Sequence, residues 1–533
     1  MSNKAAIICL LAFAQATAVC SGRQVWADRG TFSGAVETQA TLSSGRTPLW
    51  LNANRYGLGS LSSAYGYVRG TVEYDHDTDP GTVCGVRAGV DVVVPAGFKS
   101  VGYRDTYTTH LIVQQLYGSI RYHNLTLTLG ARQQPMLTKS ATLSSGGQTL
   151  GINARPVPQV RVETERWWAV PGLRGWLSLA GHMAFGVMTD GEWQESFARG
   201  SNNKYNKYTR YHEKAGYIRF GNAGRRPLTC IFGLEMAAQF GGYVYDWHGT
   251  DQNGYNGSHR IRLRSNLHSY WNAFWPGGED VGETQFKNAE GNQVGSWILR
   301  FDWTTPEWTA GLYADHYFED HSSMFLLDYD GYGSGEQWDD KERWRYLVYG
   351  LKDMMLGADI KLRSCRYLKG AVVEMITTKY QSGPIYHDHN CGNSDHVGGI
   401  DDYYNHSSLS GWQHWGQVMG NPLYRSPLYN RDGYVGTSCN RFTAWHFGIE
   451  GEALSHLDYR VLYTWQEALG TYRKPFAHSY ESTSLLVELT YTVPDRGPWS
   501  AFHGMSARLD YGADFGHVLG TGSGLQLTLR YDL

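Results

Sequence analysis

Residues 403–441 bring together side chains that can bind carbohydrate. Sugars present apolar C–H faces and many hydroxyl groups, so a surface that binds them combines aromatic rings with hydrogen-bonding side chains. The candidate glycan-binding residues are Tyr403, Tyr404, Asn405, His406, Trp412, His414, Tyr429, Asn430 and Arg441. An acidic sugar would suit Arg441 or Arg425, because a guanidinium can hold a carboxylate through two parallel hydrogen bonds.

A second interpretation of these aromatic residues stays open. A single Tyr or Trp in a chain this rich in aromatics is more often a girdle residue at a membrane interface, or packs a loop. For the segment as a whole, the sequence does not separate a binding surface from loop packing.

Catalytic signatures are missing. The chain contains neither a G-x-S-x-G nor a G-x-x-x-x-G-K-[ST] motif. His212-Glu213 begins like a zinc-protease helix but lacks the second His that the metal requires. Residues 386–396 are rich in His and Asp without a recognisable ligand spacing, which favours a polar external loop. We therefore expect no enzyme activity, no metal and no cofactor.

The elements that must position these residues alternate with a period of two. In residues 525–533, Leu and Tyr alternate with Gln, Thr, Arg and Asp up to the last residue, Leu533. The same alternation recurs at residues 125–129, 299–303, 459–466 and 485–492. Successive side chains of a strand point to opposite faces, so one face suits lipid and the other a wet lumen. This pattern predicts an all-β transmembrane antiparallel β-barrel.

A soluble β-sandwich also alternates, but three features favour the barrel. Aromatic residues cluster near strand ends, charged residues lie on the inner faces of several strands, and the last strand runs to the final residue. A terminal strand that ends on an apolar residue is similar to the signal by which barrel-assembly machinery recognises its clients.

Composition agrees with this interpretation. The 533 residues include 64 Gly, 37 Tyr and 19 Trp, yet the mean hydropathy is -0.43. Aromatic girdles, a polar interior and glycine-rich strands are typical of a membrane barrel. The net charge of -3 gives no support to nucleic-acid binding.

The N-terminus predicts export. A short basic start precedes an apolar stretch at residues 5–19, with small-x-small cleavage sites that end at Ala16 and Ala18. We expect a signal peptide at residues 1–18, one barrel domain at residues 19–533, and insertion into the bacterial outer membrane, in contact with its lipid. Among the scattered cysteines, Cys391 and Cys439 are the pair to test for a disulfide.

Polar stretches rich in Gly, Asn and Asp separate the strands. The longest are residues 202–213, 245–257, 315–342 and 381–437. Loops of this length are usually functional, and in outer-membrane barrels the long loops face outward.

Several motifs, in their order along the chain, resemble the Wzi family of capsule-assembly outer-membrane proteins. They lie at residues 48–57, 211–214, 378–388, 401–406, 411–416, 420–423, 426–430, 440–441 and 470–475. The resemblance implies an eighteen-stranded barrel with a small helical part on the periplasmic side that partly closes the lumen. It also implies a lectin-like role in holding or organising capsular polysaccharide at the cell surface.

Three functions remain compatible with the sequence. They are a surface lectin for capsular or extracellular polysaccharide, a sugar-selective porin, and an outer-membrane hydrolase. A porin needs an open lumen, whereas a hydrolase needs a nucleophile–base pair or two carboxylates at a fixed separation. The family resemblance favours the lectin.

Overall fold

The computed structural model describes residues 30–76, 83–98, 109–250, 256–275, 290–319, 353–381, 401–496 and 502–533. The expected signal peptide and the His- and Asp-rich stretch at residues 386–396 lie outside these ranges. So does Cys391, the residue to test for a disulfide with the buried Cys439.

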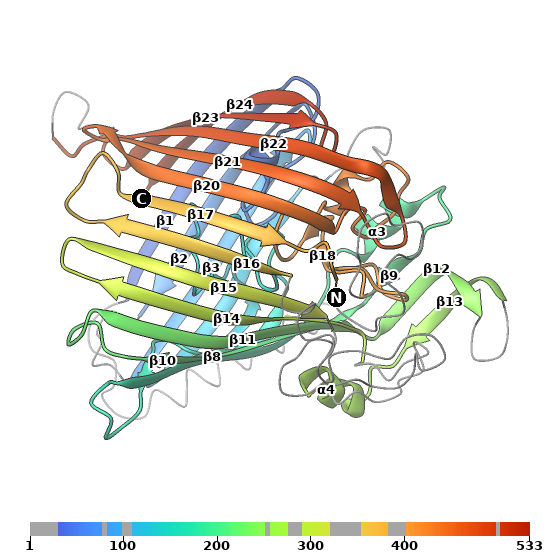
Figure 1. Cartoon of the computed structure of the whole chain (residues 1–533), viewed down its shortest axis with the longest axis horizontal. Helices are drawn as coiled ribbons and strands as arrows, with labels where there is room; N and C mark the ends of the chain where they lie inside the picture. Colours follow the sequence, from blue (N-terminus) through green and yellow to red (C-terminus); the bar gives the residue numbers. More distant parts are fainter. Residues whose placement is uncertain are drawn as a thin grey trace.

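Eighteen antiparallel strands form one closed barrel (Figure 1). The strands are β1 (Thr31–Ser43), β2 (Ala64–Asp75), β3 (Cys84–Ala96), β4 (Ile112–Tyr122), β5 (Leu125–Ala131), β6 (Gln159–Thr164), β8 (Leu177–Val187), β10 (Arg210–Phe220), β11 (Leu228–Phe240), β14 (Asn292–Thr304), β15 (Trp308–Glu319), β16 (Met354–Leu362), β17 (Gly370–Thr377), β20 (Arg441–Leu454), β21 (Leu457–Gly470), β22 (Pro475–Thr492), β23 (Met505–Gly516) and β24 (Gly522–Asp532). Each strand pairs with the next in the chain, and β24 pairs with β1 to close the ring. The predicted barrel is confirmed.

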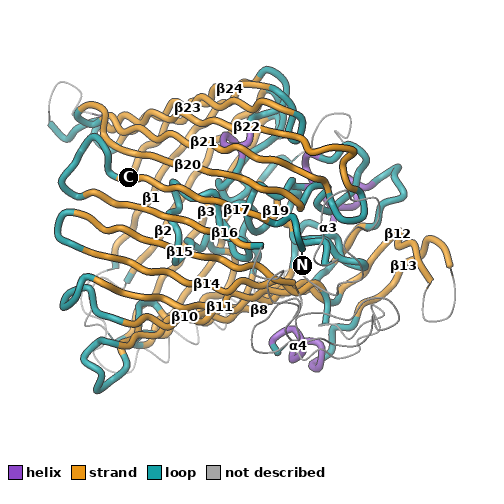
Figure 2. Tube along the Cα trace, in the orientation of Figure 1, coloured by secondary structure: helices purple, strands orange, loops and turns teal. Residues whose placement is uncertain are grey.

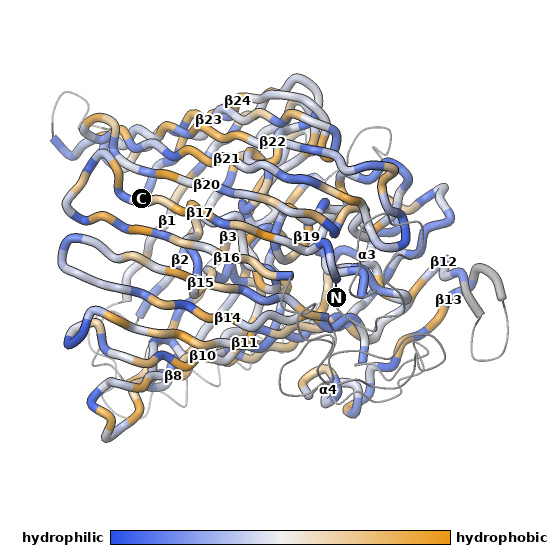
Figure 3. Tube along the Cα trace, in the orientation of Figure 1, coloured by the Kyte–Doolittle hydropathy of each residue, from blue (hydrophilic) through white to orange (hydrophobic). Residues whose placement is uncertain are grey.

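The wall has the two faces that the alternation predicted. On β24, Leu525, Leu527 and Leu529 are exposed on the outside, whereas Gln526 and Thr528 are buried inside. Figure 3 shows hydrophobic and hydrophilic residues alternating along the strands. Charged residues of the inner face form ion pairs between strands, among them Arg69–Asp91 (2.6 Å), Arg300–Asp359 (2.7 Å) and Arg460–Glu488 (2.6 Å).

The two ends of the barrel differ in their connections. Tight turns at one end join β4 to β5 and β20 to β21, and the same end holds the start of β1 and the end of β24. The opposite end carries the long connections, including residues 132–158 between β5 and β6 and residues 378–440 between β17 and β20. Because short turns face the periplasm and long loops face outward, the long-loop end is the outer end of the molecule.

Short helices and strands lie at the outer end. They are α2 (Leu49–Asn52), α3 (Gly191–Ala198), α4 (Leu267–Phe274), the 3₁₀ turn η3 (Pro427–Tyr429), and the strands β9 (Tyr205–Lys207), β12 (Gly242–Thr250), β13 (Asn256–Leu263), β18 (Gln413–His414) and β19 (Gln417–Val418). A further short strand, β7 (Trp168–Ala169), adds to β8 near the turn end. Among the described residues, no helix is long and apolar enough to cross a membrane.

Two expectations about this end differ in detail from the structure. In the described part of the chain the α-helices follow β1, β8 and β13 at the long-loop end, whereas the family resemblance implied a helical part at the periplasmic end. Parts of the stretches expected as loops are strands: residues 205–207, 210–213, 245–250 and 315–319 belong to β9, β10, β12 and β15. Polar, Tyr-rich strands at a wet outer end lack the apolar face that marks a membrane strand, so their composition is that of a loop.

Candidate functional site

The outer half of the lumen is filled by packed chain, which we call the plug. The plug consists of residues 44–63, 132–158 and 402–440. Its apolar side chains form one buried cluster with residues of the wall, including Trp50, Leu143 and Tyr404 from the plug and Tyr313 and Val372 from the strands. Figure 2 shows these loops inside the end of the barrel that bears β18 and β19.

Aromatic rings make the centre of the plug. Tyr404 stacks on Tyr424 with ring centroids 3.9 Å apart, and Tyr317 of β15 meets Tyr404 edge-on at 5.5 Å. Trp412 lies over Tyr211 of β10 at 5.9 Å. All of these rings are buried, so the plug packs as a protein core does.

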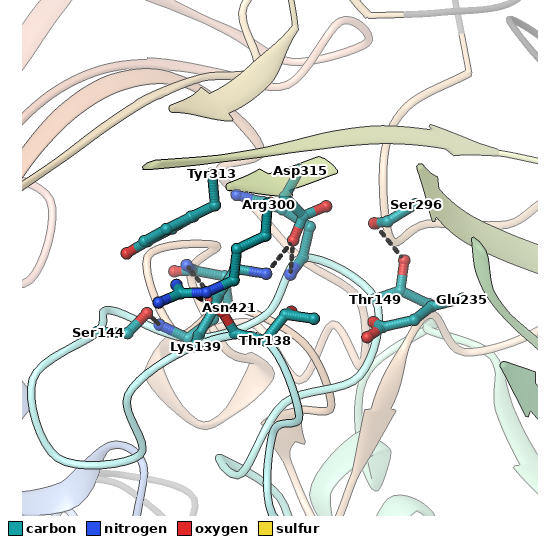
Figure 4. A network of polar contacts seen from close by, with 12 residues as sticks. Thr138, Lys139, Ser144, Thr149, Glu235, Ser296, Arg300, Tyr313, Asp315 and Asn421 are labelled. Carbon is teal, nitrogen blue, oxygen red and sulfur yellow. Dashed lines mark hydrogen bonds and ion pairs between the residues drawn. The ribbon is translucent and has the colours of Figure 1, made fainter. Parts of the chain in front are cut away.

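Hydrogen bonds and an ion pair join the plug to the wall (Figure 4). Lys139 forms a 2.6 Å ion pair with Asp315 of β15, and both side chains are almost fully buried. Thr149 and Ser296 of β14 share a hydrogen bond of 2.7 Å. Glu374 of β17 accepts hydrogen bonds from the amide of Ser145 (2.8 Å) and the hydroxyl of Tyr313 (2.6 Å).

Eight of the nine predicted glycan-binding side chains are buried in the plug or at its rim, and His406 is half-buried. Their hydrogen bonds run inward. Trp412 Nε1 donates to the carbonyl of Thr149 (3.0 Å). Tyr403 donates to Asp353 (3.1 Å), and Arg441 Nε donates to the carbonyl of Lys379 (2.9 Å).

The other candidates hold the backbone of the plug. Asn405 Nδ2 donates to the carbonyl of Thr437 (2.8 Å), and Asn430 Nδ2 donates to those of Tyr434 and Gly436 (2.7 Å each). His414 Nδ1 lies 2.8 Å from the carbonyl of Arg155. His406 Nδ1 accepts from the amides of Ser408 and Leu409 (3.1 Å each). The segment is therefore packed inside the molecule, which agrees with the loop-packing interpretation of its aromatic residues. An aromatic core bound by amides has the same composition as a sugar site. That these residues bind glycan stays a prediction.

A different surface at the outer end has the composition of a carbohydrate site. It is one face of the three-stranded sheet β9–β12–β13. We call it the tyrosine–arginine face, and it consists of Tyr205, Tyr208, Tyr243, Tyr245, Arg260 and Arg262. Figure 1 shows β12 and β13 extending beyond the end of the barrel.

Register places four of these residues on one face. Tyr243 lies opposite Arg262, and Tyr245 lies opposite Tyr205. Tyr205 and Tyr245 stack at 5.0 Å, with an angle of 8° between their rings. The guanidinium carbons of Arg260 and Arg262 lie 5.5 and 6.0 Å from the centre of the Tyr243 ring. Both arginines are exposed, and the rings of Tyr205, Tyr243 and Tyr245 are half-buried, so rings and cationic donors are accessible from one side of the sheet.

The opposite face of this sheet is apolar and fixes it to the plug. Val244 and Leu263 are buried against Leu409, with Trp247 and Ile261 packed beside them. The plug thus covers the apolar face only. The polar face is contacted at β9 by α3, where Glu195 accepts hydrogen bonds from Tyr205 (3.4 Å) and Lys207 (2.8 Å). Sequence reasoning missed the site because residues 245–257, which include most of β12 and the start of β13, were expected as a loop. Arg260, Arg262 and Arg264 alternate with Ile261 and Leu263, and this alternation could have revealed β13.

A basic cavity opens beside the plug at the same end. It has a volume of about 440 Å³ and is lined by Arg46, Arg425 and Arg431 together with Asp514 and His517. Arg425 donates through Nη2 to the carbonyl of Tyr429 (2.8 Å), while its Nε has no hydrogen-bond partner among the described residues. Burial lowers the pKa of Arg425, and nearby Arg46 and Arg431 act in the same direction. Three clustered guanidiniums favour an anionic ligand.

In the part of the chain that the structure describes, no group of three His, Cys, Asp or Glu side chains is arranged to hold a metal ion. His212 lies on a strand, where it stacks on Phe185 at 4.2 Å and its Nδ1 lies 2.8 Å from the carbonyl of Ala184.

The closed barrel, its lipid-facing band and its long outer loops define an outer-membrane β-barrel protein. Comparison with solved structures supports this class. The chain is similar in fold to Wzi of Escherichia coli, described as an outer-membrane protein involved in group 1 capsule assembly and a carbohydrate-binding β-barrel. The two share 11% identity and a TM-score of 0.52, over 93% of this chain and 83% of that one. The predicted resemblance to Wzi is thus confirmed at the level of fold.

Porins give weaker matches. Acinetobacter baumannii OccAB1 shows 9% identity and a TM-score of 0.48, over 96% of this chain and 98% of that one. Pseudomonas aeruginosa OccK2, solved in complex with glucuronate, shows 10% identity and a TM-score of 0.43, over 94% and 98%. No family model and no curated protein matches the sequence.

Proposed function

We propose that this protein is a lectin-like outer-membrane barrel that holds capsular or extracellular polysaccharide at the cell surface. The observation that carries the proposal is the tyrosine–arginine face, which stands at the outer end above a filled lumen. The similarity to a carbohydrate-binding barrel concerns the fold and agrees with this role.

The chemistry of the face suits a polysaccharide. Tyr208 is 61% exposed and lies 6.5 Å from Tyr243, so the rings offer apolar area to the C–H faces of successive sugars. Arg260 and Arg262 offer N–H donors to hydroxyl and carboxylate oxygens. A flat, solvent-facing sheet accommodates a long chain better than a closed pocket does.

The buried residues of the plug act indirectly in this proposal. Leu409 joins the plug to the apolar side of the small sheet, and Lys204 beside β9 donates to the carbonyl of His406. Tyr404, Trp412, His414 and Arg441 thus hold the support on which the binding face rests. They are positioning residues, and the tyrosines of the tyrosine–arginine face, of which Tyr208 is the exposed one, contact the glycan.

A direct binding measurement tests the proposal. Purified protein in detergent is titrated with the surface polysaccharide of the producing strain, and the retained polysaccharide of living cells is measured in parallel. Tyr208→Ala with Tyr243→Ala should weaken binding at least tenfold, because loss of a ring contact costs about 1–3 kcal/mol. Arg260→Ala with Arg262→Ala should reduce the affinity for an acidic polysaccharide more than the affinity for a neutral one.

The turn end offers a matched control. Arg366 lies 5.2 Å over the ring of Tyr367, which is also exposed, but this pair sits at the end opposite the loops. Arg366→Ala with Tyr367→Ala should leave binding unchanged. The proposal would be contradicted if the control variant lost as much affinity for the polysaccharide as the tyrosine variant. It would also be contradicted if the wild type did not bind the polysaccharide.

The same preparation separates the lectin from the porin. With its outer lumen filled by the plug, the protein should conduct few ions in a planar bilayer. High, sugar-blocked conductance in the wild type would favour the porin instead.

A further inference from the structure

Helix α4 lies on the outside of the barrel wall. Along β10, Tyr211 faces the lumen, where it meets Trp412 of the plug. His212 and Lys214, one and three residues after Tyr211, therefore face outward. The ring of Phe274 in α4 lies 6.0 Å from that of His212, and Lys214 lies 4.9 Å over the same Phe274 ring and donates to its carbonyl.

A second aromatic contact fixes the other side of α4. Tyr270 meets Phe240 of β11 at 5.0 Å and Phe185 of β8 at 5.5 Å. Asn266 caps the helix by accepting from the amide of Ser269 (2.9 Å). The helix is thus held firmly on the outer rim of β8, β10 and β11, where Figure 1 also shows it.

The opposite side of α4 is apolar and uncovered by described residues. Leu267, Trp271 and Trp275 are 89%, 59% and 57% exposed. Positions four residues apart lie on one face of a helix, whereas the buried Ser269, Asn272 and Ala273 of the helix make up the other face. Large apolar side chains arranged this way and left in water would mark an unsatisfied contact.

The apolar face continues the lipid-facing band of the wall. Met183 of β8 pairs directly with Lys214 beneath α4 and is exposed. Ile218 of β10 and Phe232 of β11 are exposed further along the same surface. Arg264, exposed just before the helix, adds a cationic donor. An amphipathic helix with Trp on its apolar side and a flanking cation is typical of a membrane interface.

We propose that α4 is an interfacial helix that binds the outer-leaflet phosphorylated glycolipid, with Leu267, Trp271 and Trp275 among its acyl chains and Arg264 beside its phosphates. This contact anchors the base of the β12–β13 hairpin at the membrane surface. It is independent of whether the tyrosine–arginine face binds glycan.

Photo-crosslinking in cells tests the proposal without altering the natural cysteines. A genetically encoded benzophenone amino acid replaces Trp271, and in separate strains Phe232 in the wall or Tyr208 on the small sheet. After irradiation, the barrel is purified and its adducts are identified by mass spectrometry. Heat-modifiability confirms that each variant has a folded barrel.

The expected result is a glycolipid adduct at position 271 and no lipid adduct at position 208. Position 232 lies four residues from the turn end of β11 and so faces the inner half of the membrane, where we expect a phospholipid adduct. Arg264→Ala should lower the yield at position 271 severalfold and leave that at position 232 unchanged. Absence of a lipid adduct at position 271, an adduct with protein, or an adduct with phospholipid alone would each overturn the proposal.

Discussion

Lys139 of the plug and Asp315 of the wall form a salt bridge of 2.6 Å between side chains that are 3% and 0% exposed. Asp315 also accepts a hydrogen bond from the amide of Gln148 (3.2 Å), so one carboxylate holds two points of the same loop (Figure 4). The pair lies between the lumen wall and the plug, where neither charge reaches bulk water.

Breaking this pair should release the plug while leaving the barrel intact. Lys139→Met leaves Asp315 buried and unpaired, which costs about 3–5 kcal/mol. We expect faster proteolysis within residues 132–158 and higher bilayer conductance, with unchanged heat-modifiability. Replacing both residues, Lys139→Met with Asp315→Leu, should restore part of the protection, because Asp315 no longer remains as an unpaired charge although Glu235 and Glu374 still lose the nearby cation.

An exposed pair supplies the control. Lys369 and Asp458 are also 2.6 Å apart, but their side chains are 45% and 47% exposed. Lys369→Met should cost about 0–1 kcal/mol and leave proteolysis and conductance as in the wild type. Opening of the channel by both substitutions would show that the plug is not held by the buried pair.

Removing two aromatic rings from the plug should lower polysaccharide retention indirectly. Tyr404→Ala with Trp412→Ala leaves cavities in the core of the plug, at about 3–5 kcal/mol for a large aromatic side chain. We expect lost glycan retention together with increased proteolysis of residues 402–440. Trp176→Ala, which truncates an exposed ring at the turn end, should change neither. Lost retention with full protease resistance would instead show direct contact of Tyr404 or Trp412 with the sugar.

Acid should loosen the plug through His406. Burial, assisted by the nearby Lys204, lowers the pKa of His406 from 6.5 to about 3, and its Nδ1 must stay unprotonated to accept from Ser408 and Leu409. The unfolded state takes up this proton first as the pH falls, so stability is complete above about pH 6.5 and declines toward pH 3.

A variant isolates this effect. In His406→Asn the side-chain oxygen can still accept from the two amides, but it does not titrate. Thermal unfolding in detergent at pH 7 and pH 4 should show a larger loss for the wild type than for the variant. Parallel losses would assign the acid sensitivity to other groups.

The last three residues should be required for assembly. Tyr531 and Asp532 pair with Val36 and Ala35 of β1, and the amide of Leu533 donates to the carbonyl of Gly34 (2.8 Å). Deleting residues 531–533 removes part of the seam and exposes strand edges, so we expect the protein to disappear from the outer membrane. Leu533→Phe keeps an apolar end and should assemble normally. Normal surface levels of the deletion would contradict a closing role for this strand end.

The sequence predicted the wall well where lipid and lumen make opposite demands, as on β24. Its signal disappears at the outer rim, because Ala237 and Ala238 of β11 are both buried, one against the plug and the other under α4. The burial of the plug residues could not be predicted for a related reason. Tyr404 packs against Tyr317, 87 residues earlier in the chain, and Trp412 packs against Tyr211, 201 residues earlier. Composition alone does not reveal such long-range contacts.

The plug is not one continuous segment of the chain. Its three segments come from loops that are synthesised far apart, and they meet only on the inner surface that the strands create. No fragment of the chain can therefore build the plug in isolation, and the loops acquire their shape only when the ring of strands does. The outer end therefore takes its final shape only after the barrel has closed and inserted. A ligand that binds this end at the cell surface will bind only fully assembled molecules.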